Sequence, residues 1–216
     1  ALANVSLDHI GQARLLYQLV ADIQADGSTE DSLAYFRDTE DFRNYALVEL
    51  PNRVPLVGYA KGDMDYGTTI VRNFLYSALM ALVWEKLQSS SNAQLAAIAA
   101  KSLKEVRYHL RHSRDWLVRL GDGTDESHQR CQAALDALWG YVPELFDSDA
   151  VDDAAAASGL GPRCADVQGT WTTEVGEVLA EATLTPPADS RFRSTGKRGV
   201  HTEHMGFILA DMQYLQ

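Results

Sequence analysis

Two pairs of residues in this sequence have the spacing of metal ligands on a helix. His9 precedes Gln12 by three residues, and Val106 precedes His109 by the same interval. Residues at i and i+3 project from one face of a helix. A Glu-x-x-His motif on each of two helices supplies carboxylates and imidazoles to the di-iron centres of four-helix bundles. The spacing is that of a di-iron site, so the residue types decide whether iron could bind.

The residue types do not complete such a site. Each iron needs carboxylate oxygen, which also balances the metal charge, and neither pair contains a carboxylate. Gln12 offers an amide, and Val106 cannot bind a metal at all. We therefore expect no functional di-iron centre. We interpret His9, Gln12 and His109 as a small buried polar cluster whose members hydrogen-bond one another or water, because an unsatisfied buried group costs ~1–3 kcal/mol.

Other histidines and carboxylates are alternative metal ligands. Glu105 stands four residues before His109, and His112 stands three after it. Four cations share this stretch: Lys104, Arg107, Arg111 and Arg114. They favour an ordinary charged helix face with internal ion pairs. His201 and His204 form a His-x-x-His motif on the last expected helix, without ligands from a second helix, and we interpret them as surface or first-turn residues.

Composition restricts the class of protein. The 216 residues are enough for one sizeable core, so a single domain over 1–216 is expected. The net charge of −11 argues against nucleic acid as a partner, because phosphate binding needs a concentrated basic surface. No stretch approaches the ~20 apolar residues of a membrane span, and the two cysteines suggest no disulfide scaffold. We expect a cytoplasmic protein without membrane contact.

Apolar residues recur every three or four positions over most of the chain, and alternating strand patterns are absent, which predicts an all-α fold. Asn92 and Thr124 are expected N-caps, and Thr68 or Thr69 caps another helix. The segments 51–67 and 188–199 are expected loops, the second flexible and solvated. The expected helices span 1–26, 31–50 (one or two short helices), 68–87, 92–121, 125–139 with a bent continuation to 146, 149–157, 166–184 and 200–216.

Several blocks carry a family resemblance. SLDHIGQARLLYQL at 6–19, DFRNYALVELPN at 41–52, KEVRYHLRHSRDWLVRLGDGTDESHQR at 104–130, ALDALW at 134–139 and GVHTEHMGFILADMQYLQ at 199–216 closely resemble the PaaC family. Its members are structural, non-catalytic subunits of the bacterial multicomponent phenylacetyl-CoA 1,2-epoxidase. The blocks occur in the same order and span nearly the whole chain, so the resemblance is specific.

The resemblance implies a ferritin-like four-helix-bundle core with additional helices, paired with a homologous catalytic subunit that holds the di-iron centre. It also implies a separate reductase subunit that uses NADPH, and O2 as co-substrate. Of the four positions that correspond to ligands of the catalytic subunit, His9, Gln12, Val106 and His109, only His109 keeps a matching ligand type. The implied role is to hold and stabilise the partner in aerobic phenylacetate degradation. Alone, the chain could form a homodimer.

The sequence departs from the family in two places. The family's first helix is absent, no capping residue precedes Ala1, and the last helix runs to Gln216 without a stop signal. We therefore expect a chain trimmed at both ends. The loop 52–67 is longer than the family pattern implies. Candidate partner surfaces are the aromatic-rich stretch 35–45 and the stretch 139–146.

Two alternatives remain open. One is a self-sufficient metal-binding ferritin-like oxidoreductase that uses His109 and Glu105 with His9 or the His201–His204 group. The other is direct binding of an acyl-CoA between the helices. An acidic protein would need clustered cations for the CoA phosphates, and four are candidates: Lys61, Arg191, Lys197 and Arg198.

Overall fold

The computed structural model describes residues 1–54, 64–188 and 191–214. Within these ranges the chain forms eight α-helices and no strand, apart from an isolated antiparallel bridge between Thr195 and Val200. The all-α prediction is confirmed. The helices are α1 (Leu2–Gln24), α2 (Glu30–Tyr35), α3 (Tyr66–Leu87), α4 (Ala93–Gly121), α5 (Asp125–Leu138), α6 (Ala150–Ala157), α7 (Gln168–Glu181) and α8 (Met205–Gln213). Short 3-10 helices lie at 39–41, 46–48, 139–141, 143–146, 164–167 and 196–198.

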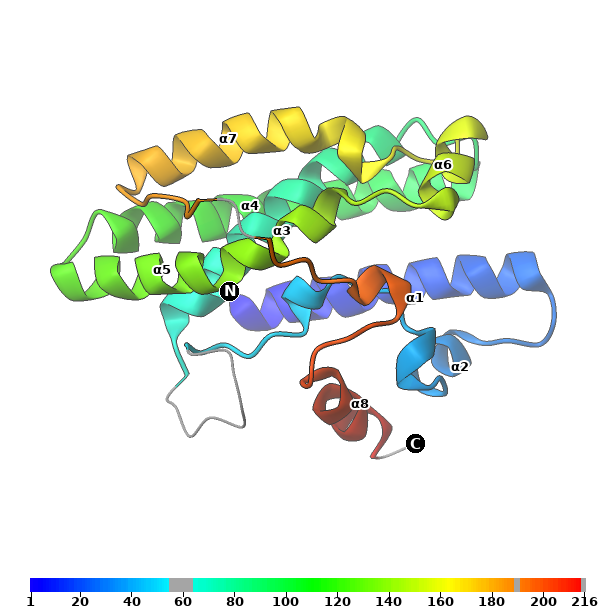
Figure 1. Ribbon diagram of the computed structural model, residues 1–216. Helices are drawn as coiled ribbons and strands as arrows, with labels where there is room; N and C mark the ends of the chain where they lie inside the picture. Colours follow the sequence, from blue (N-terminus) through cyan, green and yellow to red (C-terminus); the bar gives the residue numbers. More distant parts are fainter. Residues whose placement is uncertain (55–63, 189–190, 215–216) are drawn as a thin grey trace.

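The long helices α3 and α4 form the antiparallel pair at the centre of the molecule (Figure 1). Helices α5 and α7 pack against this pair, and α1 packs mainly against α4. Helix α8 lies at the edge of the molecule, beside α2 and the 3-10 helix at 39–41. None of the helices in the described ranges is long and apolar enough to cross a membrane.

Two hydrophobic clusters of unequal size support this arrangement. The larger joins α3, α4, α5 and α7 with the segments around 47–50 and 142–146, and it includes the buried indole of Trp171. The smaller lies where α1 meets α3 and α4, and its buried members are Leu19, Trp84, Ile98, Ala99, Leu103 and Val106. Burial of apolar surface stabilises the folded state by about 25 cal/mol per Å². The larger cluster therefore contributes most of the free energy of folding, and the contacts that hold α1 to the rest of the molecule contribute less.

Local signals explain most helix boundaries. Asn92 accepts from the N–H of Leu95 at 2.9 Å, and Thr124 caps α5 in a capping box, as predicted. The predicted cap of α3 is wrong, because Asp65, rather than a threonine, accepts from the N–H of Thr68 at 2.8 Å. Part of the predicted loop 51–67, residues 55–63, lies outside the described residues.

The end of the chain differs most from the prediction. The last helix begins at Met205, five residues later than expected, and its described part ends at Gln213. Residues 191–204, which we call the C-terminal strap, run back across the body of the molecule (Figure 1). The strap is not the solvated loop that was expected up to residue 199, since Ser194 and Gly196 are buried. A Cβ at Gly196 would collide with the carbonyl oxygen of Asn44.

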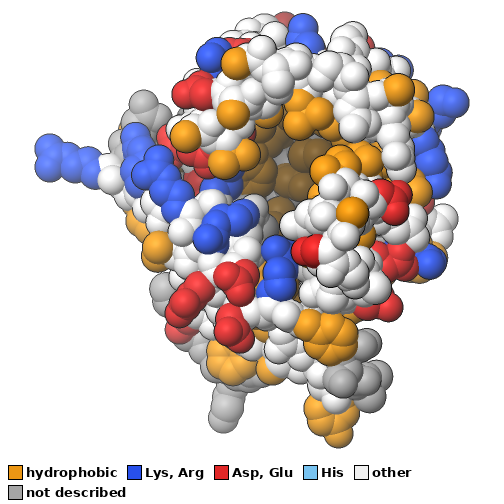
Figure 2. Space-filling view, turned by 90° about the vertical axis from the view of Figure 1, so that its right-hand side faces the viewer, with side chains coloured by type: hydrophobic (Ala, Val, Ile, Leu, Met, Phe, Trp, Pro, Cys, Tyr) orange, Lys and Arg blue, Asp and Glu red, His pale blue; other side chains and the backbone are white. Residues whose placement is uncertain are grey.

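Helix α1 covers the α3–α4 pair incompletely. Val5, Gln12 and Leu19 of α1 are buried, whereas Ile23 near its end is exposed. A cavity of about 410 Å³ lies between α1 and α3. Figure 2, which faces the end of the molecule that carries α6 and the C-terminus of α1, shows a hollow lined by hydrophobic side chains.

Candidate functional site

One histidine from each of the two ligand-spaced pairs meets the other in space. The rings of His9, on α1, and His109, on α4, lie edge to face with their centroids 5.0 Å apart. Gln12 and His109 are buried, and His9 is half-buried. The helical stripe of α4 positions His109 toward α1, as its spacing predicted, because residues three and four apart share one face. The contact between His9 and His109 agrees with the predicted polar cluster.

Two carboxylates complete the cluster, and sequence reasoning assigned neither to it in this role. Asp8 Oδ2 lies 2.9 Å from His109 Nε2, and Glu105 Oε2 accepts from Gln12 Nε2 at 2.9 Å. Asp8 was missed. The sequence could have indicated it, because Asp8 stands four residues before Gln12 and so lies on the same face of α1. The predicted polar cluster is thus joined across the two helices by an Asp–His pair and a Gln–Glu pair.

Val106 lies outside this polar network. Its side chain is 1% exposed and belongs to the small hydrophobic cluster with Leu103 and Trp84. The position that would need a carboxylate is therefore packed as part of a hydrophobic contact between helices. A charged group there would be desolvated without a partner.

The side chains of the cluster do not fit a di-iron group. Such a centre takes Glu and His from paired motifs that converge on the metals, whereas the carboxylates of Asp8 and Glu105 are each directed at a neighbouring side chain. Within residues 1–54, 64–188 and 191–214, no three His, Cys, Asp or Glu side chains are grouped so that they could hold a metal ion.

Burial shapes the electrostatics of the cluster. Desolvation lowers the pKa of His9, and the nearby His109 acts in the same direction, against a hydrogen bond with Gln12 and the charges of Asp8 and Glu105. His109 Nδ1 is buried and makes no hydrogen bond. Partial burial also lowers the pKa of His112, whose ring stacks on Tyr108 with centroids 6.2 Å apart.

The charged face expected along α4 forms ion pairs with other helices as well as within α4. Arg107 Nη2 lies 3.1 Å from Glu85 Oε1 of α3, and Arg114 Nη2 lies 2.5 Å from Glu181 Oε2 of α7. Arg114 also pairs with its neighbour Asp115. The prediction of pairs within the helix thus holds for Arg114 and Asp115, whereas Arg107 and Arg114 also connect α4 to α3 and α7, at exposed sites where each pair contributes little stability.

The His-x-x-His motif has a structural environment that the sequence did not reveal. His201 and His204 precede α8 rather than lying within it, and the side chain of His201 is only 3% exposed. His201 Nδ1 lies 2.6 Å from Glu49 Oε1, and both the N–H and the hydroxyl of Thr202 donate to Glu49 Oε2 at 2.8 Å. The surface interpretation was wrong because the acceptor, Glu49, lies about 150 residues away in the chain.

A second buried carboxylate holds the other half of the strap. Glu144 accepts from the hydroxyl of Ser194 at 2.6 Å, from the N–H of Lys197 at 2.9 Å and from the N–H of Ala46 at 3.0 Å. The ammonium of Lys197 lies 2.7 Å from Asp152 Oδ2. Of the four cations considered for CoA phosphates, Lys197 is therefore already paired, and Lys61 lies outside the described residues.

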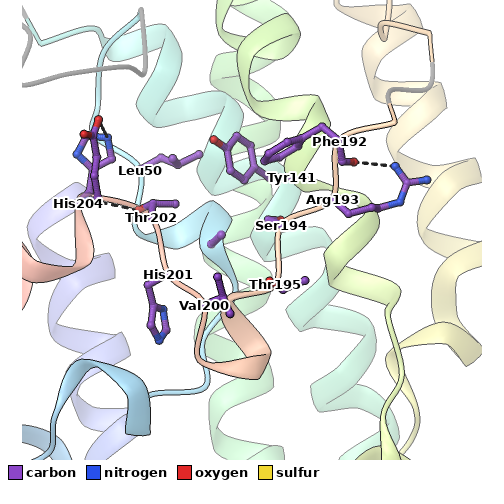
Figure 3. Close-up of a pocket in the computed structure, with 12 residues that line it drawn as sticks. Leu50, Tyr141, Phe192, Arg193, Ser194, Thr195, Val200, His201, Thr202 and His204 are labelled. Atoms are coloured by element: carbon purple, nitrogen blue, oxygen red, sulfur yellow. Dashed lines mark hydrogen bonds and ion pairs between the residues drawn. The ribbon is translucent and has the colours of Figure 1, made fainter.

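The strap lines one side of an open cavity of about 420 Å³ (Figure 3). Tyr141 and Phe192 face each other on one side of it, with ring centroids 5.0 Å apart. The imidazole of His201 is turned away from these two rings (Figure 3) and toward Glu49. The lining residues Ser194, His201 and Thr202 therefore use their polar groups to hold the strap against Glu144 and Glu49.

Comparison with known proteins places this geometry in a family. The family described as "Phenylacetic acid catabolic protein" matches residues 1–216. The chain is 43% identical over 216 residues to one of the subunits of the 1,2-phenylacetyl-CoA epoxidase of Escherichia coli (strain K12), an alignment that covers 100% of this chain and 82% of the relative. On this evidence, together with the all-α fold, the chain belongs to the phenylacetic acid catabolic protein family.

Proposed function

We propose that this chain is the structural subunit of a multicomponent phenylacetyl-CoA epoxidase. In this role it binds and stabilises a homologous di-iron catalytic subunit during aerobic phenylacetate degradation in the cytoplasm. Its membership of the family and its similarity to a subunit of the Escherichia coli epoxidase support a place in that complex. Oxygen activation belongs to the partner, and electrons from NADPH arrive through a reductase subunit.

The observation that carries the proposal is the packing of Val106. The residue fills a ligand position with an aliphatic side chain inside a hydrophobic cluster. The neighbouring carboxylates are directed at His109 and Gln12, and these contacts couple α1 to α4. A ferritin-like bundle that lacks metal ligands but keeps its helix packing can still present a rigid surface to a homologous bundle.

Metal analysis of the full natural chain tests the first half of this proposal. The chain, purified after growth with added iron, is expected to contain far less than one iron per chain and to lack activity by itself. The purified di-iron catalytic subunit serves as the positive control. Stoichiometric iron that disappears on His109→Ala would favour the self-sufficient metalloprotein instead.

Co-purification tests the second half. A tagged version of this chain, expressed together with the catalytic subunit, is expected to retain it through size-exclusion chromatography. The chain expressed alone is expected to elute as a homodimer or a monomer. A catalytic subunit that elutes separately and is equally stable without this chain would contradict the structural role.

A further inference from the structure

Helices α1, α2 and α8 form the walls of an open groove, which we call the α1–α2–α8 groove. Its volume is about 540 Å³, larger than the cavity beneath the C-terminal strap. A pocket of about 390 Å³ adjoins it and shares the wall residue Tyr35. The lining of the main groove is mostly apolar and comes from all three helices: Ile10, Ala13 and Tyr17 of α1, Ala34 and Tyr35 of α2, and Met212 of α8, with Phe42 beside them.

Several apolar side chains at this groove are exposed in the described part of the chain. Ile10 is 64% exposed, Phe36 at the end of α2 is 61% exposed, and Met212 is also exposed. Single exposed apolar residues are common on protein surfaces. A cluster of them around one groove is typical of an interaction surface. In Figure 2, hydrophobic side chains are visible at the lower end of the face, where α8 lies.

Helix α8 forms one wall and is held by few contacts. Its buried residues Met205 and Leu209 pack with Phe42 in a cluster of three. The side-chain amide of Gln213 donates to the carbonyl oxygens of Tyr35, at 2.7 Å, and Arg37, at 3.0 Å. These contacts set the distance between α8 and α2, and so the width of the groove, while leaving its apolar lining open.

The charges at the rim indicate what the partner must carry. Asp31, Asp38 and Asp41 are exposed residues of the groove and its adjoining pocket. The two guanidinium groups nearby are already engaged within the chain. Arg14 pairs with Glu30 at 2.7 Å, and Arg37 donates to Tyr17 Oη at 3.1 Å and lies over the ring of Phe42. Three aspartates face one cation, Arg37, that is bonded to uncharged groups, so the rim carries net negative charge that a basic partner would neutralise.

We propose that the α1–α2–α8 groove is where this chain binds the catalytic subunit, and that the occupant is a helix with an apolar ridge flanked by Lys or Arg. A helix fits because all three walls are helices, and an amphipathic helix places anchors at i, i+3 or i+4, and i+7 into such a groove. The inference rests on the proposed function, of which it identifies the binding surface. The stretch 139–146, the other candidate from the sequence, is a poorer surface because Val142, Leu145 and Phe146 are buried in the core.

Affinity measurements on the reconstituted pair test this surface. Ile10→Asp places a carboxylate in the apolar floor beside an acidic rim, and it is expected to weaken binding of the purified catalytic subunit about tenfold or more. Val151→Asp is the matched control, since Val151 is an exposed apolar residue (76%) on the distant helix α6, and it is expected to bind like the wild type. Circular dichroism and thermal unfolding of both variants verify that they fold.

Charge and proximity are tested separately. The double variant Asp31→Asn/Asp38→Asn is expected to weaken binding several-fold at low salt and to make it less dependent on ionic strength. A benzophenone attached at Ile10→Cys is expected to cross-link to the catalytic subunit, whereas the same label at Val151→Cys is not.

The outcomes separate the two proposals. If the wild type binds the catalytic subunit, while Ile10→Asp binds equally well and the Ile10→Cys label does not cross-link, the groove is wrong and the structural role stands. Equal weakening by Val151→Asp would also overturn the groove. If the wild-type chain does not bind the catalytic subunit at all, the proposed function itself fails.

Discussion

Val106 and His109 lie one turn apart on α4 but in different surroundings. Val106 packs with apolar neighbours, and His109 reaches Asp8 across the gap to α1. The difference arises because each residue meets a different part of α1, where polar residues near His9 and Gln12 give way to apolar residues near Leu19. The chemistry of the pair is thus decided by the partner helix as much as by the motif.

Restoring a carboxylate at position 106 is expected to destabilise the protein rather than to restore a metal site. Val106→Glu places an unpaired charge in the hydrophobic cluster and is expected to lower the free energy of unfolding by about 3–5 kcal/mol. Urea denaturation at pH 7.5 measures this, with Val106→Gln as the uncharged control of similar size. A stoichiometric gain of iron that raises the melting temperature of Val106→Glu would contradict our interpretation.

The lowered pKa of His9 predicts a pH dependence of stability. The folded-state pKa lies below the ordinary value of 6.5, so the unfolded chain binds more protons as the pH falls below about 6.5. Stability is then complete above 6.5 and decreases as the pH falls toward the folded-state pKa. His9→Gln is expected to reduce this loss between pH 7 and 5, as followed by urea denaturation.

His112 provides the internal comparison. Its pKa is lowered in the same direction, so His9→Gln should reduce the pH dependence without abolishing it, and His9→Gln/His112→Gln should flatten it further. An unchanged pH dependence in His9→Gln would mean that burial does not favour the neutral form of this imidazole.

At the scale of elements, the sequence predicted those helices whose signals are local. Asn92 and Thr124 lie where α4 and α5 begin, and the predicted bent continuation to 146 is a pair of 3-10 helices that follow α5. The last helix was predicted too long because the residues before Met205 contain no helix breaker after Gly199. In the structure, His201 and Thr202 bond Glu49 and the helix begins only at Met205. Asp8 was missed for a similar reason: its partner lies on another helix. Local spacing cannot reveal contacts made over such separations.

The C-terminal strap depends on Glu144. Glu144→Ala leaves the N–H groups of Ala46 and Lys197 and the hydroxyl of Ser194 without their acceptor, at a cost of about 1–3 kcal/mol for each group that stays buried and unsatisfied. We expect faster limited proteolysis within 191–204, measured by mass spectrometry of the fragments. The exposed residue Glu177 of α7 is the control, and Glu177→Ala should be cleaved like the wild type.

A second variant separates the hydrogen bonds from the close approach of the strap. Gly196→Ala leaves Glu144 intact but drives a Cβ into the carbonyl oxygen of Asn44, so it should also expose the strap to protease. If neither variant changes the cleavage rate, the strap is held mainly by the contacts of His201 and Thr202 with Glu49.

At the scale of the whole molecule, charge and apolar surface are distributed unevenly. The net charge of −11 does not by itself identify a protein partner. The acidic residues around the α1–α2–α8 groove, however, indicate that a partner bound there carries basic side chains. The sequence pointed to the aromatic-rich stretch 35–45 as a partner surface, and Tyr35 and Phe36 do line the groove and its adjoining pocket. The groove itself could not be predicted, because α8 comes from the opposite end of the chain.

The unequal hydrophobic clusters also imply that the molecule opens in parts. Helix α1 is joined to the rest by the smaller cluster and the Asp8–His109 and Gln12–Glu105 pairs, so its backbone amides should exchange with deuterium through local detachment. The amides of α3, α5 and α7 should exchange only when the whole chain unfolds. Mass spectrometry of peptides would show two protection levels, with α1 at the lower one. If a bound partner covers α1, the hydrogen exchange of that helix should slow before that of any other helix.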